Sequence, residues 1–314
     1  MMRRHSNKII ALILIASGLW GVGRLYFSLT DGFLVSNIVS ALPREPGRET
    51  RPLSAGEEEE LARALAQPYH YLGKGCQSYV FESEDGRYVV KFFKYQRFRP
   101  QAWLKALSFF PPIERLLEEK QVRKQKKLGL FMQAWKVAFD ELKEESGLVA
   151  VHLNKSDHLR VDFTLYDKLG FKHTVPADSL EFLIQRKADR LIPWIEREMA
   201  SGASGKVKIL LDDLIQTLVA EYRRGLSDND HALMQNTGVY RERPLHIDVG
   251  QFTRNARFAD PAVWHQELYN KTYQFRLWLL KAYPQLGEHL TLELQEAIGS
   301  DWSAMKPYFG RQHE

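Results

Sequence analysis

The longest apolar stretch of the chain lies at its N-terminus. Residues 9–23 carry no charged side chain, and basic residues precede them. A run of this kind can form the core of a signal peptide, and it approaches the length of about 20 residues that crosses a membrane if it continues to Phe27. We therefore expect residues 1–28 to be an uncleaved signal anchor that places the protein in a membrane. A cleaved signal peptide of an exported protein and a buried helix are the alternatives.

The basic residues on either side of this segment bear on its orientation. Arg3, Arg4 and Lys8 come before it. Positive flanks tend to stay in the cytoplasm, so we expect the chain after the segment to be translocated. Three arginines, at positions 44, 48 and 51, follow the segment and weaken this signal.

Polar and turn-forming residues separate the apolar segment from the rest of the chain. Residues 41–56 contain three prolines and two glycines, which is typical of a connecting segment. We therefore expect residues 29–56 to be a linker. Ser54 can cap the helix that follows, since Glu57–Glu60 place negative charge in its first turn, where the helix dipole favours it.

Strand patterns come next, and helical patterns dominate the second half. Runs rich in β-branched and aromatic residues predict three consecutive antiparallel strands, with an Asp-Gly turn between the second and the third. A 3.6-residue period predicts the long helix at 113–146, and later helices at 206–226 and 261–283. Further strands are expected as a pair at 149–154 and 160–169, and at 180–191 running into a helix. The first three strands are expected at 69–75, 78–83 and 88–93.

This order of elements predicts an α+β chain with two lobes. Residues 57–190 would form a β-rich N-lobe with one long helix, and residues 191–314 would form a mainly helical C-lobe.

Composition narrows the possible functions only slightly. The 314 residues are 44% hydrophobic and 26% charged, as in a globular protein. The net charge of +5 suits an anionic partner such as a nucleotide but selects none, and we expect no specific nucleic acid partner. A single cysteine, Cys76, excludes an intramolecular disulfide and a cysteine-based zinc site. The histidines show no metal-ligand spacing, and no Gly-x-Ser-x-Gly pattern of a hydrolase is present.

Two features in the first three strands indicate phosphate binding. Gly73 and Gly75 precede Ser78 between the first and second strands. Glycines allow the backbone to approach phosphates closely, although an ordinary hairpin turn would contain them too. Lys91 then lies inside the hydrophobic third strand, where a lysine is uncommon unless it has an anionic partner.

Two acidic features follow in the chain. Glu141 lies near the end of the long helix, where Asp140, Glu144 and Glu145 compete with it for any inward role. Asp248 and Gly250 follow a strand-like run, and a carboxylate in that position can hold Mg²⁺. Asn236, Asp228 and Asp230 precede this strand.

In this order the features resemble those of the protein-kinase-like superfamily, of which the chain would be a divergent bacterial member. The amino-acid sequences of residues 71–81 and 91–101 are also similar to those of uncharacterised kinase-like proteins of chlamydia-type bacteria. The resemblance covers residues 69–252 and implies an ATP- and Mg²⁺-dependent phosphotransferase whose acceptor, a protein or a small molecule, is unknown.

The resemblance also implies a role for each residue. Gly73, Gly75 and Ser78 would form the phosphate loop, and Lys91 would contact the phosphates while paired with Glu141. Asn236 and Asp248 would bind Mg²⁺, and Asp230 or Asp228 would orient the acceptor.

Departures from the family pattern leave two alternatives. Ser78 replaces the third glycine of the loop, and no His-Arg-Asp is present. Asp230 and Asp228 precede Asn236 by six and eight residues, where the family has five. A catalytically dead pseudokinase that acts as a protein-interaction scaffold therefore remains an alternative, as does an unrelated α+β protein. Residues 94–110, which mix basic and aromatic side chains, could contact a membrane surface or stack on RNA.

Overall fold

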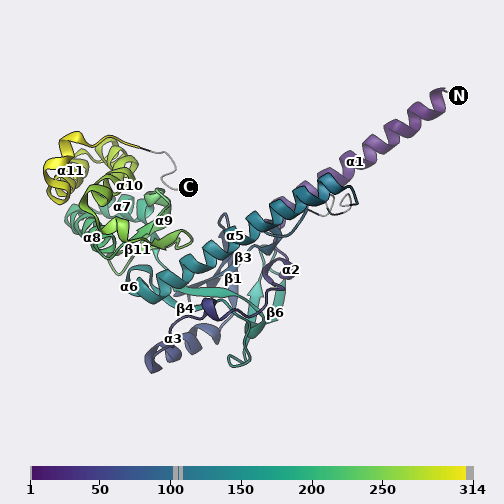
Figure 1. The fold of residues 1–314 in the computed structure, drawn as a ribbon, viewed down its shortest axis with the longest axis horizontal. Coiled ribbons are helices and arrows are strands. Elements are labelled where there is room, and N and C mark those ends of the chain that lie inside the picture. Colours follow the sequence, from purple (N-terminus) through teal and green to yellow (C-terminus); the bar gives the residue numbers. More distant parts are fainter. Residues whose placement is uncertain (1, 102–104, 106–108, 309–314) are drawn as a thin grey trace.

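The structure is a computed structural model that describes residues 2–101, 105 and 109–308, with the side chains of the first helix described from Ile13 onward. The segment 94–110, predicted to contact a membrane or RNA, falls partly outside the described residues, at 102–104 and 106–108. Figure 1 shows a helical lobe, a lobe built on a β-sheet, and one long helix that projects away from both.

The projecting helix is α1 (Met2–Thr30). Residues 13–30 are apolar enough to cross a membrane, and residues 13–29 are exposed. The helix has the length and composition of a membrane anchor or of a signal sequence. The predicted N-terminal apolar helix is therefore confirmed.

In the described residues, seven strands form the N-lobe sheet in the order β4-β7-β3-β2-β1-β5-β6. Neighbouring strands are antiparallel except β1 and β5, which are parallel. The strands are β1 (Tyr69–Lys74), β2 (Ser78–Ser83), β3 (Tyr88–Phe93), β4 (Leu148–His152), β5 (Asp162–Tyr166), β6 (Lys172–Pro176) and β7 (Phe182–Arg186). The predicted β1-β2-β3 meander is confirmed.

The predicted pairing of the next two strands is wrong. Both β4 and β5 exist, but β4 is one edge strand of the sheet, while β5 lies on the far side, next to the other edge strand β6. β4 pairs with β7, while β5 pairs with β6, a strand that the sequence did not predict. Strand patterns show which segments are extended, whereas partners depend on contacts between distant segments.

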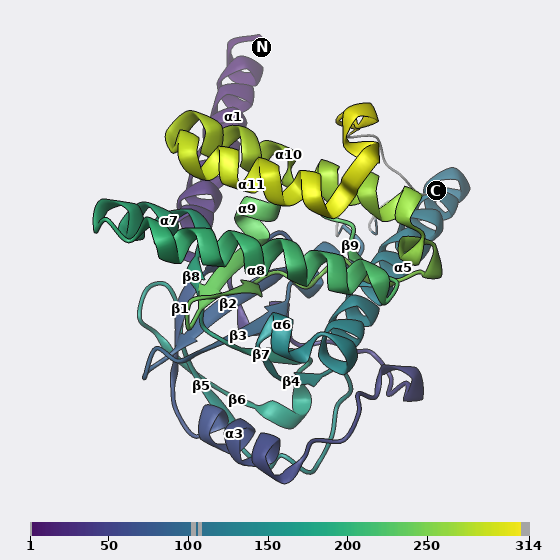
Figure 2. The same cartoon turned by 90° about the vertical axis from the view of Figure 1, so that its left-hand side faces the viewer.

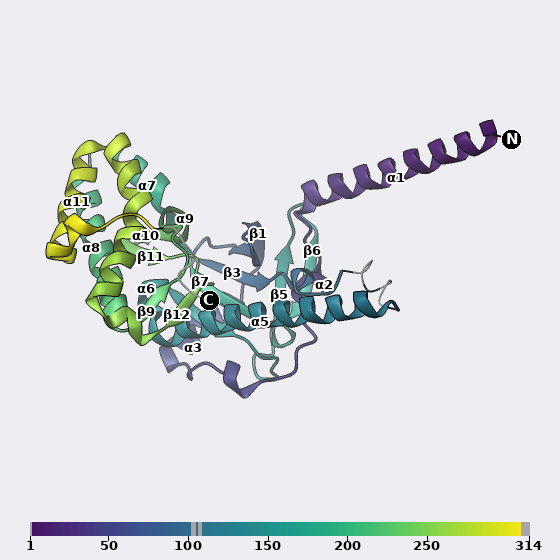
Figure 3. The same ribbon diagram turned by 45° about the horizontal axis from the view of Figure 1, so that its top comes forward.

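The long helix α5 (Pro111–Glu141) crosses one face of this sheet, and Figure 3 shows it running separately from α1. Its buried side chains begin at Leu128, and Trp135 stacks on Phe93 of β3 with 3.9 Å between ring centroids. The helix ends at Glu141, and the short α6 (Lys143–Ser146) follows instead of the continuous helix to 146 that was predicted. Ser54 is the N-cap of α3 (Ala55–Leu65), as predicted.

The segment predicted as a linker, residues 29–56, packs on the N-lobe instead of forming a free tether. Phe33 is 3% exposed and Ile38 in α2 (Val35–Ile38) is fully buried. Further along, Asn154 holds Glu45 through hydrogen bonds to its backbone N–H and its carbonyl, both of 3.0 Å. Apolar residues scattered among prolines and glycines anchor the segment, although its composition is that of a connection.

The C-lobe is mainly helical, as Figure 2 shows with this lobe facing the viewer, and its helices enclose their own hydrophobic core. Its helices are α7 (Leu191–Ala200), α8 (Ser204–Arg223), α9 (Leu233–Asn236), α10 (Pro261–Ala282) and α11 (Pro284–Ile298). Its short strands are β8 (Asp189–Arg190), β9 (Leu226–Asp228), β10 (Thr237–Tyr240), β11 (Arg243–His246) and β12 (Phe252–Arg254). Single 3-10 turns lie at Pro46–Arg48, Tyr95–Arg97, Ala177–Ser179, Ala256–Ala259 and Gly299–Ala304.

Candidate functional site

A cavity of about 530 Å³ lies between the two lobes. The turn between β1 and β2 forms one wall, and the segments that follow β9 and β11 form the opposite wall. The N-lobe supplies basic side chains and the C-lobe supplies acidic ones. The charged and amide residues that line the cavity are Gln77, Arg97, Lys124, Lys127, Asp228, Asp230, Asn236, Asp248 and Gln251.

The loop above the cavity is held by hydrogen bonds from the residues that follow β3. The carbonyl of Gly75 accepts a hydrogen bond from Lys94, and the carbonyl of Cys76 accepts one from Arg97. Burial, reinforced by Lys74 and Arg97, lowers the pKa of Lys94 to about 8. The loop is further closed by a 3.0 Å bond from the Gly75 N–H to the carbonyl of Ser78.

The loop also meets the Asp-Val-Gly segment directly. A Cβ at Gly250 would lie 2.8 Å from Oε1 of Gln77 and 3.2 Å from Oδ1 of Asp248. A larger residue at 250 would therefore displace the Gln77 side chain from its position beside Asp248.

Lys91 lies on β3 next to Asp248, but it is not among the residues that line the cavity. Its Nζ donates a hydrogen bond to the carbonyl of Ile247. Burial lowers the pKa of Lys91, and the negative charge of Asp248 opposes that shift. A partly desolvated ammonium group beside this carboxylate is suited to an anionic ligand.

The predicted pair between Lys91 and Glu141 is not formed. Glu141 forms an ion pair with Arg254 of β12, and no ion pair or hydrogen bond joins it to Lys91 in the described residues. The reason is the position of Glu141 at the last turn of α5, while the turn of α5 before it packs against the N-lobe core with apolar side chains, Val137 and Ala138. The competing Glu145 bonds Arg224 at 2.9 Å, and Asp140 bonds Lys136 at 2.7 Å.

The two candidate acceptor-orienting aspartates have different surroundings. Asp228 is 3% exposed and forms a 2.9 Å ion pair with Lys271 of α10. Burial raises the pKa of Asp228, and Lys271 opposes this shift. Asp230 is only half-buried, and its carboxylate accepts hydrogen bonds from Gln251 at 3.1 Å and from the N–H of Ala232 at 3.0 Å. Asp230 is therefore the more accessible of the two.

Asn236 and Asp248, the predicted Mg²⁺ ligands, both line the cavity. The carbonyl of Asn236 accepts hydrogen bonds from the N–H groups of Ile247 at 2.8 Å and Asp248 at 3.4 Å. The Asp248 carboxylate is exposed to the cavity, and its Oδ1 accepts a 3.0 Å bond from the N–H of Gly250. A carboxylate and an amide that line one cavity are oxygen ligands of the type that Mg²⁺ prefers, so these residues fit that ion.

The sequence prediction missed residues that hold the site together. Lys271 donates to the carbonyls of Asp228 at 3.1 Å and Asp230 at 3.0 Å, in addition to its ion pair. Lys94 and Arg97 were noted only as part of a basic aromatic segment. A lysine on the apolar face of a helix, as Lys271 is, was the available signal.

The fold and this cleft define the class of protein. Two lobes are joined at residues 187–190, a glycine-containing loop covers the cleft, and an Asp-x-Gly segment follows a C-lobe strand at its floor. The chain therefore has a bilobal, protein-kinase-like fold, and the predicted α+β class is confirmed.

Comparisons with known proteins add distant structural neighbours. No protein-family model matches the chain, and no curated protein matches it. Among solved structures, WbdD is similar at 17% identity with a TM-score of 0.39; the match covers 76% of this chain and 48% of WbdD, about half of that chain's length. Rv3197 of Mycobacterium tuberculosis, solved in complex with erythromycin, is similar at 18% identity with a TM-score of 0.34, covering 91% of this chain and 75% of the other.

Likeness at this level identifies neither a substrate nor a partner. The resemblance to kinase-like proteins of chlamydia-type bacteria stays a prediction.

Proposed function

We propose that the protein is an ATP- and Mg²⁺-dependent phosphotransferase that is anchored in a membrane or exported. The observation that carries this proposal is the interlobe cavity that Asp230, Asn236 and Asp248 line from one side while the loop at 76–77 lines the other. Lys91 lies next to Asp248, which lines this cavity, although Lys91 itself is not a lining residue.

Each group has a part in this proposal. Lys91 and the loop N–H groups would bind the phosphates of ATP, and Asn236 and Asp248 would hold Mg²⁺. When bound, Mg²⁺ would neutralise negative charge on the phosphates. Asp230 would orient the acceptor hydroxyl. Asp228 would hold the segment that carries Asp230 in place through Lys271. In reactions of this type positioning and electrostatics provide most of the rate enhancement.

Nucleotide binding is tested by thermal unfolding of the full chain in detergent. The full chain is needed because residues 30–40 pack into the N-lobe core. ATP with Mg²⁺ is expected to raise the midpoint of unfolding, whereas ATP with EDTA is not. Lys91→Met and Asp248→Asn are expected to lose this shift.

Two exposed N-lobe residues provide matched controls. Lys172→Met and Asp162→Asn make the same chemical changes on β6 and β5, away from the cavity. They should keep the full shift. A folded wild-type protein without any Mg²⁺-dependent shift would contradict the proposal.

A pseudokinase scaffold is the second candidate, and specific contacts favour it. Lys91 lacks the glutamate partner that the family resemblance implies, and Asp228 is neutralised by Lys271. The two functions differ in turnover. An active enzyme would release ADP, and Asp230→Asn would lower that rate at least about 10²-fold without loss of ATP binding.

Asp228→Asn tests the assignment of the two aspartates. Since Asp228 is buried against Lys271, this change is expected to lower stability more than it lowers the rate per folded molecule. ATP binding with no ADP release by the wild-type protein would leave the scaffold function.

A further inference from the structure

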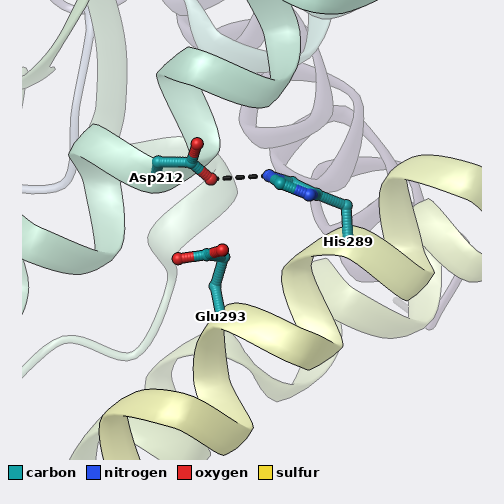
Figure 4. A group of neighbouring side chains, drawn as sticks. All are labelled: Asp212, His289 and Glu293. Atoms are coloured by element: carbon teal, nitrogen blue, oxygen red, sulfur yellow. Dashed lines mark hydrogen bonds and ion pairs between the residues drawn. The ribbon is translucent and has the colours of Figure 1, made fainter.

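Three potential metal ligands meet on the C-lobe, away from the interlobe cavity. Asp212 of α8 faces His289 and Glu293 of α11, and Figure 4 shows the three side chains pointing toward one another. One ligand atom from each residue lies within 4.8 Å of those of the other two. Nε2 of His289 is 2.6 Å from Oδ1 of Asp212.

The packing of the two helices fixes this arrangement. His289 and Glu293 are four residues apart and therefore share one face of α11. The neighbouring Leu290 and Leu294 are buried in the same core as Leu211 and Leu214 of α8. The three polar side chains thus lie at the rim of a rigid helix–helix contact, on elements whose geometry does not depend on a loop.

The charges at this rim are not balanced by the protein. The carboxylates of Asp212 and Glu293 face each other, with one oxygen of each within 4.8 Å of the other. In the part of the chain that the structure describes, no hydrogen bond or ion pair links the Glu293 carboxylate to another residue. The His289 imidazole is hydrogen-bonded to Asp212. In the described residues it forms no hydrogen bond with the second carboxylate, that of Glu293.

We propose that Asp212, His289 and Glu293 form a binding site for a divalent transition metal ion of the zinc type. One imidazole nitrogen and two carboxylate oxygens are ligands that Zn²⁺ accepts, and three protein ligands leave a further position for water. The imidazole disfavours Mg²⁺ and Ca²⁺, which prefer oxygen ligands. A bound ion would neutralise both carboxylates. It would also link α8 to α11 through its ligands.

Zinc titration of the untagged, chelator-treated full chain in detergent tests this proposal. Calorimetry is expected to detect one tight Zn²⁺ equivalent per chain. His289→Ala and Glu293→Gln are each expected to weaken that binding at least tenfold. Co²⁺ in place of Zn²⁺ should give visible absorption bands in the wild-type protein that both variants lose.

The matched control is a second histidine–aspartate pair. His265 lies 2.8 Å from Asp301, and neither belongs to the three-residue cluster. His265→Ala should leave tight Zn²⁺ binding unchanged. Equal loss in His265→Ala, or tight binding that survives both His289→Ala and Glu293→Gln, would overturn the site.

Folding of the variants is checked without metal. In EDTA, Glu293→Gln should melt at the same or a higher temperature than the wild-type protein, because it removes repulsion between carboxylates. With Zn²⁺, only the wild-type protein should gain thermal stability. If Glu293→Gln gains as much as the wild-type protein, Glu293 is no ligand and the proposal fails.

Discussion

Lys271 supports the floor of the cleft from within the C-lobe. Its ammonium group is 3% exposed and contacts the Asp228 carboxylate and two backbone carbonyls. A buried charge with this many partners fixes the course of the chain from β9 to α9. The position of Asp230 in the cavity therefore depends on a residue about forty positions later in the sequence.

Loss of this lysine should be severe. Lys271→Met leaves the Asp228 carboxylate buried and unpaired, so we expect the free energy of unfolding to fall by about 3 kcal/mol or more. Urea denaturation measures the change. Lys281→Met, an exposed position on the same helix, should have almost no effect. Asp228→Leu combined with Lys271→Met should be less destabilised than Lys271→Met alone, and additive losses would contradict the buried pair.

Lys94 gives the loop a pH dependence with a defined sign. Its pKa falls from 10.5 to about 8 on folding, mainly through burial, so the folded state binds fewer protons between these values. The penalty for burying the charge is present below pH 8 and disappears as pH rises to 10.5. The stability of the wild-type protein relative to Lys94→Met should therefore rise across this range, by at most roughly 3 kcal/mol. Parallel pH curves for the two proteins would contradict this.

At the scale of elements, α1 continues directly into the N-lobe core. Asp31 forms a 2.8 Å ion pair with Lys74, which lies between the two glycines of the loop, and Tyr79 donates a 2.6 Å hydrogen bond to the Gly32 carbonyl. Phe33 packs edge-on against Tyr79 and Phe81 with ring centroids 5.3 and 5.1 Å apart. The residues that end the apolar helix therefore contact the glycine loop and the strand that follows it directly.

A pair of adjacent substitutions tests this connection. Phe33→Ala should lower the free energy of unfolding by about 3 kcal/mol, because it leaves a cavity in the N-lobe core. Leu34→Ala, one residue later and 48% exposed, should change it by less than about 0.5 kcal/mol. Chemical denaturation in detergent compares them. Equal, small effects would mean that residues 29–56 are a tether after all.

The elements that the sequence predicted are those with strong local patterns. β1, β2 and β3 have β-branched and aromatic runs around an Asp-Gly turn, and the long helix has a clear period. β6 was missed because only Val175 among its five residues is a buried apolar side chain, so its strand pattern is weak. Its pairing with β5 is a tertiary contact that a local pattern does not reveal. Local motifs pointed to two residues that line the candidate cavity, Asp248 and Gly250. Glu141 was misplaced because a helix end can be recognised while the direction of its side chain cannot.

At the scale of the whole molecule, the proposed function depends on which side of a membrane the two lobes lie, because α1 projects from them as a candidate anchor. The basic residues before the apolar segment predict that the two lobes are translocated. A phosphotransferase on that side needs a destination that contains ATP, such as another cell. Reporter fusions at the C-terminus should be active only outside the cytoplasm. Activity only in the cytoplasm would reverse the predicted orientation and leave ATP directly accessible.

The most direct test of the central claim is hydrogen–deuterium exchange of the full chain with and without ATP and Mg²⁺. The proposed site predicts slower exchange at two places that are far apart in sequence, residues 73–79 and 246–251. Lys91→Met should abolish this protection at both places. Protection confined to other surfaces, or no change in a folded protein at saturating nucleotide, would contradict a nucleotide site between the lobes.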